Sequence, residues 1–90
     1  MEAQRIAHAV VSERLAACVN ILPAIQSVYR WQEKIESAEE VLMLMKTTQE
    51  RFPALRDRIV QLHSYDTPEI IALTIAAGAE KYLAWLGSQV

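Results

Sequence analysis

The chain lacks the residues that would place it in several functional classes. It has one cysteine, Cys18, so no disulfide can form within the chain, and we expect a reducing compartment, the cytoplasm. Nine Lys and Arg against eleven Asp and Glu give a net charge of -2 without a block of like charge, which argues against a nucleic-acid partner. The longest apolar stretch, residues 70–77, is too short to span a bilayer, so we expect no membrane partner. The charged start MEAQR predicts no signal peptide.

Motifs of enzyme chemistry are also missing. With two glycines in the whole chain, there is no glycine-rich phosphate loop and no Gly-x-Ser-x-Gly elbow. No pair of carboxylates flanks a pocket loop. His63 and Glu69 could be regarded as a catalytic dyad, but most small proteins contain a histidine and a carboxylate of this kind. We therefore expect no enzymatic activity.

Apolar side chains are abundant for so short a chain. Ninety residues make one domain, residues 1–90, and the hydrophobic set accounts for 52% of them. A chain of this size hides only about 60% of the surface that its unfolded form exposes. Some apolar surface is therefore expected to face other chains, which predicts a homo-oligomer.

Three segments have the apolar spacing of amphipathic helices. The first is residues 2–15, and the second follows Thr48, a plausible cap, and ends around His63. Pro53 is tolerated there only because it stands near the helix start. A short closing helix follows Gly78. The inner stripes are Ala3, Ile6, Ala7, Val10 and Val11, then Phe52, Leu55, Ile59 and Leu62, then Tyr82, Leu83, Trp85 and Leu86.

The segment from Ala16 to Thr48 predicts a long β-hairpin. Pro23 interrupts the first strand, as proline does at an edge or a bulge. Residues 32–34 are polar and mark the turn, without the Asn-Gly or Asp-Gly pair of a tight hairpin. Residues 41–45, VLMLM, do not alternate, which is typical of a strand covered on both faces. One helix layer covers one face, so we expect a second chain to cover the other. The aromatic face of the first strand carries Ile25, Ser27, Tyr29 and Trp31.

A further apolar strand is predicted from Glu69 to Ile75. The order is then helix, strand, strand, helix, strand, helix, an α+β pattern with helices on one face of a mainly antiparallel sheet. One more strand in front would complete the ferredoxin-like βαββαβ unit.

Six segments of the chain have a distinctive order and spacing: RLAACVN at 14–20, SVYRW at 27–31, EVLMLMKT at 40–47, HSY at 63–65, PEIIAL at 68–73 and YLAWL at 82–86. Together they resemble the CutA family of divalent-cation tolerance proteins over essentially the whole chain. The resemblance implies a ferredoxin-like domain in a tight trimer, in which each hairpin extends the sheet of a neighbour. It also implies a link to copper and other divalent cations, and a shape like that of the PII-type signalling trimers.

Three features depart from the family pattern. The family begins with a central strand, whereas here the first helix is expected directly from Glu2, which predicts a gap between the last strand and the hairpin. Each buried backbone group left unpaired there costs roughly 1 to 3 kcal/mol. Glu33 stands where the family usually has glycine, so the hairpin tip is expected to differ. Ser64 and Thr74 replace prolines, which loosens the loop and the last strand.

The best metal-ligand candidates are His63 and Cys18, because imidazole and thiolate suit copper and zinc. Their spacing forms no metal motif, and two ligands fall short of a typical site unless a threefold axis repeats them. The residue types by themselves favour structural roles, with Cys18 as a small buried side chain and His63 as a cation near a helix C-terminus. The hypothesis is weak binding of copper or another divalent cation through His63, with Cys18 as a further ligand.

A second group of polar residues follows from the family layout. Lys46, Tyr65 and Glu69 would flank a cleft between subunits and could hold a small anionic ligand. Tyr29, Trp31 and Glu40 would lie beside them at the subunit interface. The alternative is a satisfied interface in which lysine and glutamate pair across subunits.

Three functions are therefore open. The first is a non-enzymatic, homotrimeric protein of divalent-cation tolerance or binding, with copper as the implied metal. The second is a PII-like module that senses a small ligand. The third is a stable trimeric scaffold that binds metal incidentally.

Overall fold

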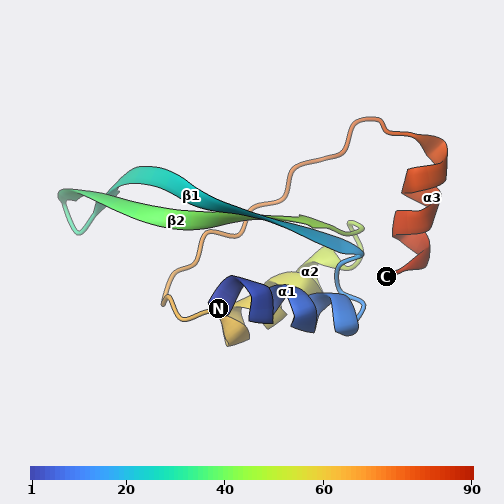
Figure 1. Cartoon of the computed structure of the whole chain (residues 1–90), viewed down its shortest axis with the longest axis horizontal. Helices are drawn as coiled ribbons and strands as arrows, with labels where there is room; N and C mark the ends of the chain where they lie inside the picture. The colour runs from blue at the N-terminus through green and yellow to red at the C-terminus, as the bar shows by residue number, and fades with distance from the viewer.

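The structure is a computed structural model that describes residues 1–90. Its elements are helix α1 (Glu2–Ser12), strands β1 (Cys18–Trp31) and β2 (Lys34–Lys46), and helices α2 (Phe52–Leu62) and α3 (Glu80–Ser88). The strands form one antiparallel sheet, and α1 and α2 lie together on one side of it (Figure 1). The predicted α+β class is confirmed. None of the three helices has the length and apolar character needed to cross a membrane.

The predicted hairpin is confirmed and is the longest feature of the protein. Its register runs from Cys18 opposite Lys46 to Trp31 opposite Lys34. Pro23 and Ala24 together stand opposite one residue of β2, so the predicted irregularity at Pro23 is a bulge, with Ala24 at a φ of 62°. The outer half of the hairpin extends beyond the helices (Figure 1), which gives the molecule extents of 45 × 26 × 21 Å.

The hairpin tip is a two-residue turn built from residues that suit it poorly. Gln32 and Glu33 have φ values of 49° and 67°. Positive φ at both central residues matches the type I′ turn, which strongly prefers Asn-Gly. For residues other than glycine this conformation costs roughly 1 to 2 kcal/mol each.

Replacing the turn by Gln32→Asn with Glu33→Gly is therefore expected to stabilise the protein by roughly 1 kcal/mol, since glycine also loosens the unfolded chain. The measurement is the urea concentration at half-unfolding, at one fixed protein concentration. Glu36→Gly, within β2, is the control and should lower stability by about 0.5 to 1 kcal/mol. Equal effects of both changes would show that the turn conformation does not limit stability.

The hydrophobic core lies between the two helices and the base of the hairpin. It consists of Ile6, Val10, Ala16, Leu55 and Ile59. Ile6 and Val10 of α1 and Leu55 and Ile59 of α2 confirm most of the predicted inner stripes, but Val11, predicted to face inward, is 41% exposed. The Thr48 hydroxyl accepts a hydrogen bond from the Arg51 N–H (3.3 Å) just before α2. Only 8 of 90 residues are buried, all of them apolar, so a single chain leaves much of its apolar surface uncovered.

The strand predicted from Glu69 to Ile75 is wrong. These residues belong to neither a helix nor a strand, and the main chain of residues 66–78 makes no hydrogen bond within the protein. The composition suits a strand, but a strand forms only against a partner, and β2 is not within hydrogen-bonding reach. Ile70 still packs against the core, whereas Leu73 is 85% exposed.

The predicted closing helix is confirmed as α3, which lies apart from α1 and α2 near the C-terminus (Figure 1). Only Leu86 of its predicted apolar stripe is buried. Tyr82 and Trp85 stack on each other, with ring centroids 5.6 Å apart, and both remain substantially exposed. This helix therefore presents an aromatic pair at the surface of the chain.

Candidate functional site

The largest hollow of the molecule is a cavity of about 1540 Å³ between the hairpin and the extended segment that follows α2. One wall is formed by β2 and the outer half of β1, and the opposite wall by residues 65–75. Ile6, Leu55 and Ile59 from the helices also line it, so the cavity reaches the hydrophobic core. Most of its lining is apolar.

The structure brings the second predicted group of residues together. Residues that are far apart in the sequence line this one cavity: Tyr29, Trp31, Glu40, Lys46, Tyr65 and Glu69. β1 supplies the first two, β2 the next two, and the extended segment the last two. Their proposed roles in binding a ligand or a neighbouring subunit stay predictions.

Lys46 is not a free cation in this arrangement. Its ammonium group donates hydrogen bonds to the side-chain oxygen of Asn20 and to the backbone oxygen of Leu44 (3.3 Å). Both acceptors belong to the same hairpin, and they hold the ammonium beside β1 and β2. An anionic ligand would have to bind the ammonium in addition to these contacts or replace one of them.

Tyr65 is a residue of the cavity lining whose pKa is shifted by its surroundings. The negative charge of Glu40 raises the pKa of the Tyr65 phenol above its ordinary value of 10.0, and partial desolvation and Tyr29 act in the same direction. The phenol therefore stays protonated at neutral pH and can donate a hydrogen bond. Because the unfolded chain releases this proton first, its contribution to stability falls as the pH rises past 10.0.

Glu40→Gln is expected to lower the pKa of Tyr65 toward 10.0, because it removes the largest cause of the shift. A spectrophotometric titration of tyrosinate absorbance measures this, and Tyr65→Phe identifies which of the three transitions belongs to Tyr65. Glu39→Gln is the matched control, one residue away and exposed. If both variants shift the transition equally, the effect comes from net charge and not from the Glu40 position.

His63, the predicted metal ligand, is held by local contacts at the end of α2. Its Nδ1 accepts a hydrogen bond from the Tyr65 backbone N–H (2.9 Å), and the two rings meet edge to face at 4.8 Å. A neutral imidazole that accepts at Nδ1 carries its proton on Nε2. A metal ion at Nε2 would therefore require the proton to move and the Nδ1 contact to break.

Glu2, at the start of α1, contacts the same loop after α2. Its carboxylate accepts a hydrogen bond from the Ser64 backbone N–H (2.7 Å). Hydrogen bonding to Ser64 lowers the pKa of Glu2. The carboxylate thus stays ionised and ties the start of α1 to the loop after α2.

Cys18, the other predicted metal ligand, does not lie with His63. It is half-buried at the start of β1, opposite Lys46, and does not line the cavity that His63 lines. β1 begins and α2 ends at opposite ends of the body (Figure 1). No group of three His, Cys, Asp or Glu side chains in the chain is placed to hold a metal ion. Metal binding through both residues stays a prediction and would require ligands from more than one chain.

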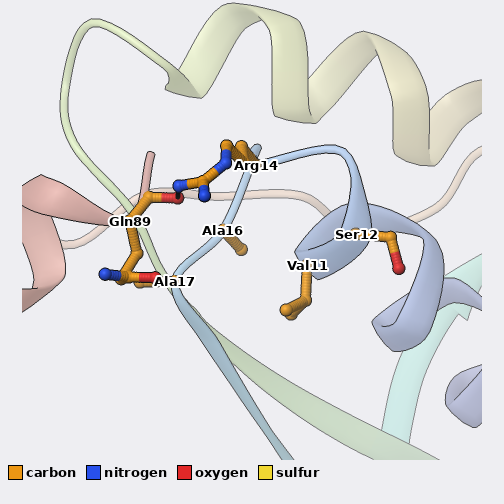
Figure 2. A pocket seen from close by; sticks show the side chains of 6 residues that line it. All are labelled: Val11, Ser12, Arg14, Ala16, Ala17 and Gln89. Carbon is orange, nitrogen blue, oxygen red and sulfur yellow. Dashed lines mark hydrogen bonds between the residues drawn. The ribbon is translucent and has the colours of Figure 1, made fainter.

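A second, smaller pocket of about 160 Å³ lies where the chain passes from α1 into β1. Figure 2 shows the guanidinium of Arg14 directed at the backbone oxygen of Gln89, to which it donates a hydrogen bond (3.2 Å). The predicted first helix, residues 2–15, included Arg14. The structure places it after α1, with a φ of 59°, where it fastens the C-terminal end. The sequence did offer a signal that the helix ends before Arg14, because Arg14 follows Val10 and Val11, the last residues of the predicted inner stripe.

Comparison with known proteins assigns the chain a family. A family model described as CutA1 divalent ion tolerance protein matches residues 1–89. The divalent-cation tolerance protein CutA of Thermus thermophilus is 54% identical over 84 residues, which cover 93% of this chain and 82% of that protein. Human protein CutA is 49% identical over 84 residues, which cover 93% of this chain and 47% of that protein. The chain therefore spans most of the bacterial relative and about half of the human one.

Solved structures agree with this result. The divalent cation tolerance protein of Thermus thermophilus superposes with a TM-score of 0.95 at 51% identity, covering 98% of this chain and 85% of that chain. The PII-like protein CutA from Nostoc sp. PCC 7120 in apo form gives a TM-score of 0.88 at 32% identity, covering 96% of this chain and 84% of that chain.

Proposed function

The chain belongs to the CutA1 family of divalent ion tolerance proteins, and on that premise we propose that it is a non-enzymatic homotrimer that acts in tolerance to divalent cations such as copper. The observation that carries the cation role is the 54% identity to a divalent-cation tolerance protein over 93% of the chain. Sequence identity of this extent over most of the chain supports a shared role.

The hairpin supports the trimeric part of the proposal. Its outer half exposes large apolar side chains: Val28 is 68% exposed, Ile35 64% and Trp31 48%. An apolar patch of this kind on a small protein marks a surface for another chain. In the proposed assembly each hairpin extends the sheet of a neighbour, and the subunits together have the ferredoxin-like arrangement.

The metal part of the proposal depends on this assembly. Within one chain His63 and Cys18 are apart, and no three-ligand group exists. A threefold axis brings equivalent side chains together, so a site could combine His63 of one subunit with residues of another. Such a site would bind weakly, because the His63 ring must first give up its contact with the Tyr65 N–H.

Calorimetric titration of zinc or copper into the wild-type protein and into His63→Ala tests the metal part. We expect wild type to bind and His63→Ala to lose most of the binding heat. His8→Ala is the matched control, because His8 is the other histidine and is exposed on α1. Identical isotherms for wild type and His63→Ala would contradict a role for His63. The same titration of Cys18→Ser tests whether the Cys18 thiol is a further metal ligand.

A second candidate function is the sensing of a small ligand, favoured by the likeness to a protein described as PII-like and by the polar group on the cavity wall. A thermal-shift screen with metals and nucleotides separates the candidates, because a ligand that binds only the folded state raises the melting temperature. A shift with a nucleotide that disappears in Lys46→Ala favours sensing. No shift with any compound favours a trimeric scaffold with incidental metal binding.

A further inference from the structure

The bulge in β1 changes the course of the hairpin. Two residues of β1, Pro23 and Ala24, stand opposite the single residue Val41 of β2. A bulge of this kind bends the strand that carries it and increases the local right-handed twist. Ala24 has a φ of 62°, in the left-handed region that suits glycine better than alanine. Such a conformation persists only where the surrounding structure holds it, so the bulge is a fixed part of the hairpin.

The exposure of the β2 side chains shows that the hairpin turns about its own axis near this bulge. On the base side, Met43 and Met45 are half-buried and pack against the core, whereas Leu44 between them is 46% exposed. On the tip side, the half-buried side chains are the even-numbered ones: Glu36, Ala38 and Glu40. Neighbouring side chains of a strand point to opposite faces. The face of β2 that is turned toward the body therefore changes between Glu40 and Met43.

This change of face is local. An unbulged ribbon twists gradually along its whole length. Here the change takes place within residues 40–43 of β2, directly beside the bulge. Figure 1 agrees, because β1 lies above β2 at the outer end of the hairpin and below it at the base. The bulge is thus the point at which the outer half of the hairpin is turned relative to the base.

The turn decides which side chains the outer half presents away from its own body. Val28 and Ile35 are 68% and 64% exposed, more than any other large apolar side chain of the hairpin. Val28 pairs with Ser37, and Ile35 pairs with Arg30, so both lie on the face of the odd-numbered residues of β2. This part of the hairpin extends beyond the helices, which therefore do not cover it (Figure 1).

We propose that the bulge at Pro23 and Ala24 aims the outer half of the hairpin at a second copy of the chain. The proposal rests on the proposed homotrimer and adds the feature of the sequence that sets its geometry. A ring of identical subunits closes only if each subunit meets the next at one fixed rotation. A hairpin with one residue fewer in β1 would still pair its two strands, but its outer half would point elsewhere and the ring would not close.

Deletion of Pro23 is the main test variant, because it leaves Ala24 alone opposite Val41 and keeps every other strand pair. Light scattering is expected to show a fall in mass from near three chains to one. Pro23→Ala is the matched control, since it keeps two residues opposite one, and it should remain trimeric. Ala24→Gly keeps the bulge with a residue that suits its φ, so it should also remain trimeric and should unfold at a higher urea concentration.

A capture experiment separates a misdirected hairpin from an unfolded chain. Affinity-tagged deletion chains are co-expressed with untagged wild-type chains and captured by the tag, with tagged wild type as the reference. The helices and the base of the hairpin are unchanged in the deletion chain, so it should still accept the hairpin of a wild-type copy. We therefore expect wild-type chains to be captured with it, although deletion chains alone form no trimer.

Four results would overturn the proposal. A deletion variant with the mass and urea midpoint of wild type would show that the bulge does not matter. Loss of the trimer in Pro23→Ala would assign the effect to proline and not to the extra residue. Deletion chains that capture no wild-type chain would show that the bulge serves the chain's own folding. A wild-type mass near one chain would overturn the proposed homotrimer itself, whereas the first three results leave the homotrimer standing.

Discussion

Trp31→Ala is expected to abolish the trimer and, with it, the folded state. Wild-type protein should have a solution mass near three times the chain mass of 10.2 kDa, measured by light scattering. Trp31 is 48% exposed in the single chain, at the end of β1 next to the turn, so its ring is available to a neighbouring subunit. Tryptophan is enriched among the residues that dominate interface energy. Removing a packed tryptophan costs about 3 to 5 kcal/mol.

The loss of folding follows from the size of the core. With 8 buried residues, the single chain has little to stabilise it outside the assembly. Obligate homo-oligomers often have no stable folded monomer. Circular dichroism on the same samples measures this second effect.

Arg30→Ala is the control for Trp31→Ala. Arg30 precedes Trp31 in β1 and its side chain points to the opposite face, so its removal should leave both mass and secondary structure unchanged. A folded, monomeric Trp31→Ala protein would contradict the proposed role of the hairpin. A wild-type mass near one chain would contradict the assembly itself.

Ile59→Ala is expected to lower the free energy of unfolding by about 2 to 5 kcal/mol, the range for truncating a buried isoleucine. Ile59 is 7% exposed and contributes to the only buried cluster of the chain, together with Ile6 and Leu55. The total free energy of unfolding of small proteins is about 5 to 15 kcal/mol, so this single change removes a large share of it. Chemical denaturation at fixed protein concentration measures it.

Val60→Ala is the matched control, on the same helix and one residue away. Val60 is 52% exposed, so its truncation should change stability by no more than about 0.5 kcal/mol. A comparable loss in both variants would mean that Val60 is buried against a neighbouring subunit, which would itself support the proposed assembly. A negligible loss in Ile59→Ala would contradict the location of the core.

Local patterns in the sequence predicted most of the secondary structure. The three-and-four spacing of Ile6 and Val10, and of Leu55 and Ile59, predicted the two helices and their buried faces correctly. Pro23 correctly marked the irregularity in β1, because proline cannot continue a strand ladder. These predictions succeeded because periodicity and proline act on neighbouring residues.

Residues 69–75 show where local patterns fail. Their composition is that of a buried strand, yet they remain unpaired, because pairing depends on which backbone lies beside them. The candidate site depends in the same way on distant segments. The cavity that joins Tyr29, Glu40 and Tyr65 appears only once the chain has folded, and the raised pKa of Tyr65 follows from that proximity.

The sequence by itself determined the helical faces, the hairpin and its excess of apolar surface, and the family to which the chain belongs. Only the tertiary structure decided that residues 69–75 stay apart from β2, that Cys18 and His63 lie at different ends, and that one cavity joins residues of β1, β2 and the extended segment. The physical reason is that helix stripes and turns depend on residues a few positions apart. Sheet edges, ligand groups and shifted pKa values depend on contacts between segments that are distant in the chain.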